Sequence, residues 1–322
     1  MTATGTYCPY DVTPLTDRVS GTEFGVSTAF GRLRCLGSGP SDGGSVTLFI
    51  HGVHDDMDSW GPLVHAAHRQ GVDLGSTLFV DLPGFGRSEN RRGRLDLTEV
   101  GDALMSVVVS ELGFSKVRLV GHSMGTLVVA DMAVRHASRV ESVHLAAGPY
   151  YSVAENMNGH WSGGVAGGLA TAMFAGQYLL ALTGGAGVAT LRFASRRGLL
   201  RPLMAPFVAH PEALRQTVLD HLVAGVRPAS FRAAARNGFS YRDGMSWSRV
   251  QCPVWAVYGA ADRLVPGTDA RRLLADLPDA QITRLADASH LVHLERPEDA
   301  LTALGLARPQ RRQHDPRGSG LR

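Results

Sequence analysis

The amino-acid sequence predicts an α/β protein with one mostly parallel, doubly wound sheet and a helical insertion over the carboxyl edge of that sheet. Short apolar stretches alternate with longer stretches of helical periodicity, which is typical of parallel strands covered on both faces. The alternation stops between residues 149 and 248. We therefore expect residues 1–148 and 249–307 to form the sheet domain and residues 149–248 to form a lid.

The predicted elements follow one another in a regular order. Residues 25–39 predict an edge strand or hairpin, because polar residues and glycines punctuate them. Buried strands are expected at residues 46–50, 78–80, 116–120, 140–148, 252–260 and 280–288. Helices are expected at residues 60–70, 97–112, 124–136, 269–276 and 297–306, with Pro62 near the start of the first and Thr98 as the N-cap of the second.

Composition and charge place the chain among ordinary globular proteins. Of 322 residues, 44% are hydrophobic and 19% are charged, which allows a sizeable core without disulfides or a metal. The net charge is +3, but residues 308–322 hold five arginines against one aspartate. The rest of the chain is close to neutral, so nothing indicates a nucleic-acid partner. Residues 308–322 are expected to be a basic, disordered tail.

Cysteine usage and the first residues predict the compartment. Cys8, Cys35 and Cys252 are odd in number and scattered, which fits neither a disulfide framework nor a metal-ligand spacing. The first residues contain no basic region followed by an apolar run, so no secretory signal is expected. A reduced, cytoplasmic protein is the simplest prediction.

Residues 161–191 carry no charge and are long enough to span a membrane. However, Gly184, Gly185 and Gly187 interrupt this stretch, and it lies between two strands of one predicted sheet. We interpret it as an apolar lid over an oily pocket and expect no membrane contact.

The stretch "VRLVGHSMGTLVVA", residues 117–130, predicts a reactive serine. A strand ending near Val120 must turn sharply into a helix beginning near Met124. Gly121 and Gly125 remove side chains that would collide as the helix packs, and Ser123 occupies the apex of the turn. This is the logic of the G-x-S-x-G nucleophile elbow. The helix N-terminus behind Ser123 offers an unpaired N–H to developing negative charge.

A serine hydroxyl is a weak nucleophile and needs a base. Asp262 follows the predicted strand that ends near Tyr258, and His290 follows the one that ends near Leu285. Because the carboxyl ends of parallel strands share one edge, Ser123, Asp262 and His290 are expected to meet there.

The motifs together resemble the α/β-hydrolase superfamily, in its lidded esterase, lactonase and carbon–carbon-bond hydrolase branch. The matching pieces are "LFIHGVHDDMDSW", "VDLPGFGRS", "GHSMG", "YGAADRLVP" and "SHLVHLERP". The resemblance implies that Ser123 is the nucleophile, His290 the general base and Asp262 its orienting acid. It also implies an oxyanion hole made by the backbone N–H groups of Val53 and Met124. No cofactor or metal is implied.

Other polar residues near the predicted triad have structural interpretations. His293 and Asp287 lie close to His290, but the family pattern makes the first histidine of the run catalytic. His51 and Asp81 are expected to be structural. His54, Asp55, Asp56 and Asp58 make the loop after residue 50 very polar, and we interpret that loop as solvated rather than as a metal site.

The resemblance implies hydrolysis of an ester, lactone, thioester or activated carbon–carbon bond in a medium-sized apolar metabolite, with secondary metabolism as the setting. Relatives with a non-hydrolytic activity (a cyclase, a cofactor-free oxygenase or a perhydrolase) provide the alternative, and a small-molecule receptor is a further one. The oligomeric state stays open. Substrate contacts are expected from His54, Trp60, His122, Tyr150, Trp161, Phe174 and Tyr178.

Overall fold

The structure is a computed structural model that describes residues 6–39, 41, 43–152, 175–238, 246–265 and 267–307. Its centre is an eight-stranded sheet in the order β1-β2-β4-β3-β5-β6-β7-β8. Strand β2 runs antiparallel to both of its neighbours, and the remaining pairs are parallel. The strands are β1 (Thr22–Thr28), β2 (Gly31–Gly37), β3 (Ser45–Ile50), β4 (Ser76–Val80), β5 (Lys116–His122), β6 (Val140–Ala146), β7 (Val254–Gly259) and β8 (Gln281–Leu285).

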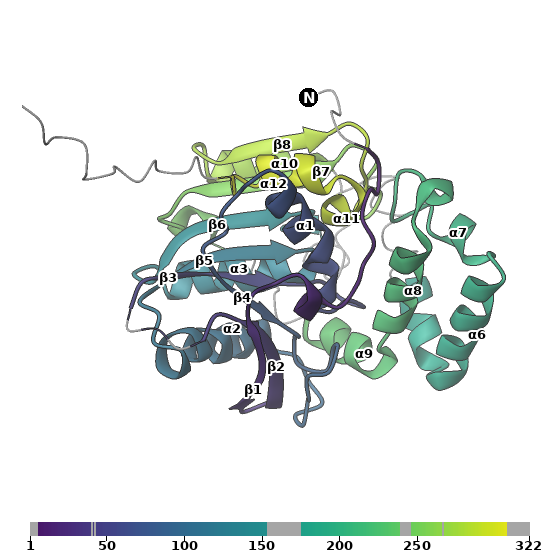
Figure 1. Ribbon diagram of the computed structural model, residues 1–322, viewed down its shortest axis with the longest axis horizontal. Coiled ribbons are helices and arrows are strands. Elements are labelled where there is room, and N and C mark those ends of the chain that lie inside the picture. Colours follow the sequence, from purple (N-terminus) through teal and green to yellow (C-terminus); the bar gives the residue numbers. More distant parts are fainter. Residues whose placement is uncertain are drawn as a thin grey trace, which may run out of the picture.

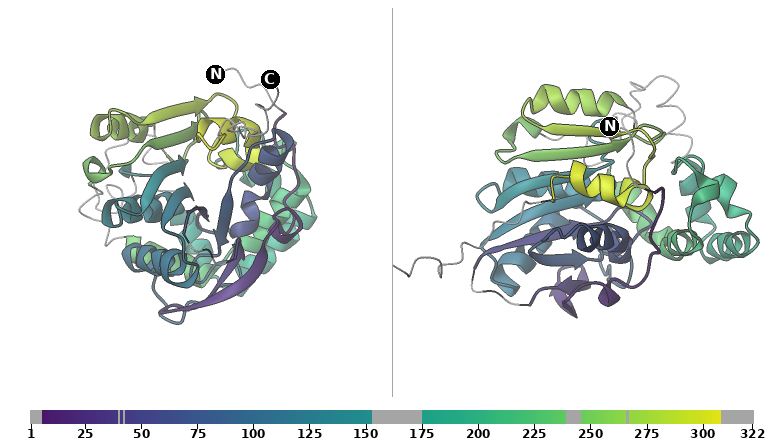
Figure 2. Two further views of the ribbon diagram at one scale, coloured as in Figure 1. Left: turned by 60° about the vertical axis from the view of Figure 1, so that its left-hand side comes forward. Right: turned by 45° about the horizontal axis from the view of Figure 1, so that its top comes forward.

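Helices cover both faces of this sheet (Figures 1 and 2). One face carries α1 (Gly61–Arg69), α11 (Val292–Glu295) and α12 (Pro297–Ala303), and the other carries α2 (Leu97–Ser106), α3 (Met124–Arg135) and α10 (Gly267–Asp276). Successive strand residues point into different cores: Leu48 belongs to the core under α2 and α3, and Phe49 belongs to the core under α1 and α12. Burial on both faces explains why the central strands are continuously apolar.

The predicted fold class is confirmed, and so is the hairpin at residues 25–39, which is β1 and β2. The prediction that Thr98 caps α2 is wrong. Asp96, not Thr98, accepts hydrogen bonds from the N–H groups of Thr98 and Glu99. Thr98 already belongs to the helix, and the carboxylate before it satisfies the free donors of the first turn. The predicted helix at residues 97–112 continues beyond α2 as a π-helical turn, η3 (Val107–Glu111).

A helical insertion connects β6 to β7, which are neighbours in the sheet. Its described helices are residues 175–182, α6 (Gly185–Arg196), α7 (Leu200–Leu203), α8 (Gln216–Gly225) and α9 (Pro228–Gly238). They lie together at one end of the sheet (Figure 1). Apolar side chains of α6, α7 and α8 form a third core with the N-terminal segment and α11, which includes Val12, Leu219 and Leu294. Among the described helices, none has the length and apolar character needed to cross a membrane.

Candidate active site

The turn between β5 and α3 has the geometry of a nucleophile elbow. Ser123 occupies it with φ 50° and ψ −120°, a strained conformation for a residue with a side chain. A Cβ added at Gly121 would lie 2.7 Å from the carbonyl oxygen of Gly125, and one added at Gly125 would lie 2.4 Å from that of Ile50. The collisions expected from the sequence are therefore present at both glycines, and α3 can approach the sheet only because neither position carries a side chain.

Replacing Gly125 with alanine should destabilise the protein by about 3 kcal/mol, because the new methyl group meets backbone that cannot move aside. The measurement is urea denaturation. Gly185→Ala is the matched control: it also lies in the first turn of a helix, but an added Cβ there meets nothing within 4 Å. The control should be neutral or stabilising, and equal losses in both variants would contradict the packing argument.

His290 joins Ser123 to Asp262. The Nε2 atom of His290 lies 2.9 Å from the Oγ of Ser123, and its Nδ1 atom lies 3.0 Å from Oδ2 of Asp262. The other carboxylate oxygen accepts hydrogen bonds from the N–H groups of Leu264 (2.8 Å) and Val265 (3.0 Å). The side chain of Asp262 is 1% exposed. With the Nδ1–H group donating a hydrogen bond to the carboxylate, Nε2 carries the lone pair that can accept the proton of Ser123.

The loop after β3 approaches the serine closely. A Cβ added at Gly52 would lie 3.0 Å from the Cβ of Ser123, so the glycine lets the backbone of this loop reach the site. Val53 and Met124, the expected oxyanion donors, both line the cavity beside Ser123. His51 lies beneath the loop, where its Nε2 accepts the N–H of Leu82 at 2.9 Å.

A cavity of about 760 Å³ opens in front of Ser123 and His290. The sheet domain contributes Met124 and Leu127 to its wall. Most of the other residues of the wall belong to the insertion, including Leu180, Leu200, Met204, Phe207 and Phe231. The reacting groups therefore face a space of the size of a small-molecule site with a largely apolar wall.

Comparison with known proteins identifies the family. The sequence profile of the Alpha/beta hydrolase family matches residues 47–304. The chain belongs to this family. It is 26% identical over 267 residues to the dihydrolipoyllysine-residue acetyltransferase component of the acetoin cleaving system of Pseudomonas putida, a match that covers 80% of this chain and 61% of that protein. The chain thus spans about three fifths of the length of that relative.

Two further similarities lie within the hydrolases. The chain is 29% identical over 223 residues to the pimeloyl-[acyl-carrier protein] methyl ester esterase of Aromatoleum aromaticum, covering 68% of this chain and 81% of that enzyme. Among solved structures, carboxylesterase CesB (YbfK) from Bacillus subtilis superposes with a TM-score of 0.65 at 20% identity, covering 91% of this chain and 93% of the other. At that identity the superposition shows the α/β-hydrolase fold.

In this α/β hydrolase the expected substrate contacts fall into three groups. His54 and His122 line the cavity. Trp60 and Tyr150 are absent from its described wall, and their burial elsewhere contradicts those two expectations. Tyr178 is not among the described lining residues either, and its contact with substrate stays a prediction. Trp60 is fully buried against Phe49 and His293, and Tyr150 is buried between Trp247 and Tyr258. Large aromatic rings fill the cores beside the site instead. Trp161 and Phe174 lie outside the described residues.

The acidic loop after β3 is not solvated as the sequence suggested. Asp55 is 3% exposed, and its Oδ1 atom lies 2.8 Å from Nε2 of His221 in α8. Burial acts to lower the pKa of His221, but the hydrogen bond and charge of Asp55 raise it to about 9. Burial likewise acts to raise the pKa of Asp55, and His221 holds it below its usual value. An ion pair thus connects the insertion to the loop that carries Val53.

Neutral histidines surround this pair. His54, with φ 56°, stacks on Phe231 of α9 at 4.6 Å between ring centroids, and burial lowers its pKa to about 4. Burial also lowers the pKa of His293 to about 4 and that of His122 well below its usual value.

In the described chain, two groups could offer three ligand atoms to a metal ion: Asp55 with His122 and His293, and Asp55 with Asp56 and His221.

Glu295, a residue that sequence reasoning missed, holds the loop of His290. Its carboxylate accepts the N–H groups on both sides of that histidine, from Ser289 (3.0 Å) and Leu291 (3.1 Å). It also accepts the N–H of Ala209 at 2.7 Å and the hydroxyl of Tyr7 at 3.0 Å. The sequence "HLERP" contains this glutamate, but two of its four partners, Tyr7 and Ala209, come from distant parts of the chain.

Glu295→Ala should destabilise the protein by about 3 kcal/mol or more and lower turnover, because it leaves several buried donors without an acceptor. Denaturant melts and initial rates check this. Glu212→Ala, at a side chain that is 76% exposed, is the control and should stay within about 0.5 kcal/mol of the parent. A stable Glu295→Ala protein with unchanged turnover would rule out this role.

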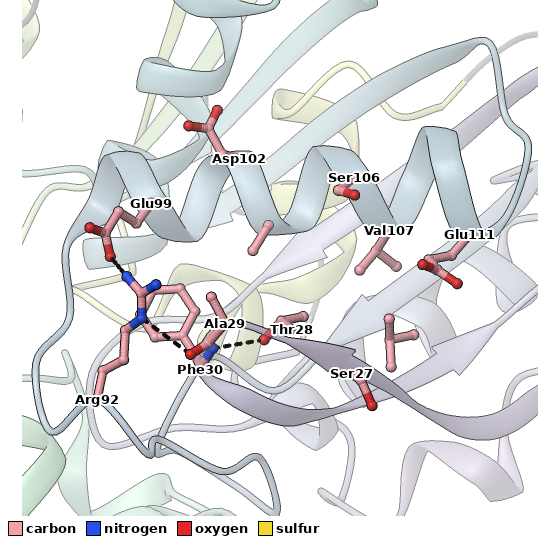
Figure 3. A pocket seen from close by; sticks show the side chains of 12 residues that line it. Ser27, Thr28, Ala29, Phe30, Arg92, Glu99, Asp102, Ser106, Val107 and Glu111 are labelled. Atoms are coloured by element: carbon pink, nitrogen blue, oxygen red, sulfur yellow. Dashed lines mark hydrogen bonds and ion pairs between the residues drawn. The ribbon is translucent and has the colours of Figure 1, made fainter.

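A second hollow of about 400 Å³ lies between the β1–β2 hairpin and α2. Figure 3 shows Arg92 paired with Glu99 at one end, beside the ring of Phe30, with Ser27 and Glu111 toward the other end. None of the site residues expected from the sequence lines this hollow.

Proposed function

We propose that this α/β hydrolase is a serine hydrolase that cleaves an ester, lactone or thioester of a medium-sized apolar metabolite. The observation that carries the proposal is the position of His290, which contacts Ser123 at 2.9 Å and Asp262 at 3.0 Å at the wall of an apolar cavity. The similarity to a methyl ester esterase supports the same reaction class.

The acylation step uses groups of this chain alone. His290 accepts the Oγ proton of Ser123 as the oxygen attacks the substrate carbonyl carbon. The carbonyl π electrons move to oxygen, and the N–H groups of Val53 and Met124 stabilise the resulting oxyanion. Each such donor contributes about 10²–10³ in rate. His290 then protonates the leaving group as its bond to the carbonyl carbon breaks.

The deacylation step repeats this cycle with water. His290 removes a proton from water, the hydroxide oxygen attacks the acyl carbon, and the proton passes to the Oγ of Ser123 as the acyl–oxygen bond breaks. Asp262 stabilises the imidazolium that forms twice per turnover. Its two backbone hydrogen bonds hold the carboxylate in the orientation that this requires.

The proposed lid, residues 149–248, determines which substrates enter. Leu200, Met204 and Phe207 come from this region and face the cavity. Apolar walls of this kind bind apolar substrate parts at a gain of about 25 cal/mol per Å² buried. Short, charged esters gain little of this energy and are expected to be poor substrates.

The test is a turnover assay with p-nitrophenyl esters of increasing acyl length, aromatic lactones and thioesters, combined with mass spectrometry of the enzyme. The proposal expects an acyl adduct on Ser123 and a rate that rises with apolar acyl size. Turnover of the parent and of Ser123→Ala is compared under conditions in which both proteins are folded. Turnover that survives in Ser123→Ala but disappears in His290→Ala would instead indicate chemistry that uses only the base.

A further inference from the structure

The outer helices of the insertion expose apolar side chains. Six large apolar residues of the described chain are exposed, and five of them lie between residues 175 and 203. These five are Leu179 (63%), Leu182 (59%), Phe193 (55%), Leu199 (61%) and Leu203 (61%). Single exposed leucines are ordinary, but such a concentration on one region marks an interaction surface.

The same region is rich in arginine and free of acids. From residue 156 to residue 211 the sequence contains four arginines and no aspartate or glutamate. Arg192, Arg196 and Arg197 are exposed, and no carboxylate of the described residues pairs with them. The guanidinium of Arg197 lies 4.9 Å from the ring centroid of Phe193. We call Leu179, Leu182, Phe193, Leu199 and these three arginines the arginine–leucine face.

This face continues into the cavity. Leu203 is exposed and also lines the cavity, and its neighbours Leu200 and Met204 line it as well. Helices α6 and α7 form the outer end of the molecule, away from the sheet (Figure 1). A surface that met this end would therefore lie beside the entrance to the apolar cavity.

We propose that the arginine–leucine face docks on an anionic lipid surface. Apolar side chains flanked by arginines are the pattern of segments that lie in the headgroup region of anionic membranes. Docking of this kind needs no spanning helix, so the interruption of residues 161–191 by glycines does not oppose it. A second copy of the chain fits less well, because a symmetric contact would bring together six arginines that pair with no carboxylate of the described residues.

Docking would let an apolar substrate pass from the lipid into the cavity. That delivery step rests on the proposed hydrolase function, whereas docking itself does not. Binding to vesicles can therefore be measured without any turnover, and Ser123→Ala should bind them as tightly as the parent.

The experiment is co-sedimentation of the full chain with vesicles of phosphatidylcholine and phosphatidylglycerol, compared with vesicles of phosphatidylcholine alone. The parent should bind the anionic vesicles more tightly. The triple variant Arg192→Gln/Arg196→Gln/Arg197→Gln should weaken that binding by about 100-fold, because each arginine near the surface contributes about five-fold in affinity. Phe193→Ser/Leu199→Ser should weaken binding to both kinds of vesicle.

Matched controls remove similar groups elsewhere. Arg91→Gln/Arg139→Gln/Arg271→Gln lowers the net charge by the same amount, and Leu274→Ser removes the exposed leucine of α10. Both controls should bind vesicles like the parent. Labelling of Ser123 by a fluorophosphonate should be equal in the parent, the arginine and Phe193→Ser/Leu199→Ser variants and the two controls, which separates a failure of docking from a failure of the proposed chemistry.

Three outcomes would overturn the proposal. The first is no preference of the parent for anionic vesicles. The second is an equal loss of binding in the triple variant and its charge-matched control. The third is a dimer, seen by sedimentation equilibrium, that Phe193→Ser/Leu199→Ser dissociates while vesicle binding stays unchanged; this would assign the face to a second copy of the chain.

Discussion

Ser123→Ala will lower turnover of the best ester substrate by about 10⁴-fold or more, because alanine offers no atom that can form the acyl-enzyme. KM should change little, since the cavity wall stays intact. The measurement is steady-state kinetics with mass spectrometry, in which the acyl adduct of the parent should be absent from the variant. Alanine keeps the Cβ of serine, so the backbone strain at this position is unchanged and the folding stability should change little.

Thr126→Ser is a suitable control for the serine variant. Its hydroxyl donates to the carbonyl of Ser123 at 2.6 Å, and serine can make the same bond without entering the chemistry. Turnover should stay within a few-fold of the parent. A Ser123→Ala protein that retained a tenth of parental turnover would exclude covalent catalysis by this residue.

His221→Ala will destabilise the protein by about 3–5 kcal/mol, because it leaves Asp55 charged and buried without its partner. The two side chains are 9% and 4% exposed, so solvent cannot replace the missing contact. Urea denaturation measures the loss. Arg215→Ala removes the ion pair between Arg215 and Asp11, which also connects the insertion to the N-terminal part. These two side chains are 43% and 40% exposed. The loss of this pair should therefore lower the free energy of unfolding by less than about 1 kcal/mol.

The same pair predicts a dependence of stability on pH. The pKa of His221 in the folded protein is about 9, against 6.5 for an ordinary histidine. Its stabilisation is therefore complete below pH 6.5 and decreases as the pH rises toward 9, by up to about 3 kcal/mol. Denaturation at both pH values should show this decrease in the parent and not in Asp55→Asn. An identical decrease in both proteins would assign it to another group.

The parts of the site that were predictable lie next to strand ends. Ser123, Asp262 and His290 come within a few residues of the ends of β5, β7 and β8, so the shared edge of a parallel sheet brings them close together. The glycines around Ser123 indicate that α3 packs closely against the backbone of the sheet, where a side chain would collide. Local sequence carries both signals.

The parts that were not predictable depend on contacts between distant segments. His221 lies 166 residues from Asp55, and nothing near either residue indicates the other. Trp60 was expected to contact the substrate, but the short helical turn that contains it directs its ring into the core with Phe49. Which side of a helix faces a cavity is decided by packing partners, and a sequence window does not contain them.

The insertion leaves the sheet after β6 and returns at β7, and these two strands are hydrogen-bonded neighbours from Val143↔Val254 to Ala146↔Val257. Its two ends are therefore held together by the sheet itself, whatever lies between them. Doubling the length of a segment inserted between two such strands raises the entropic cost of closing the loop by only about 0.6 kcal/mol. Evolution can accordingly exchange or enlarge this region while the hydrolytic groups keep their positions, so new specificities can arise at little cost to the folding of the sheet.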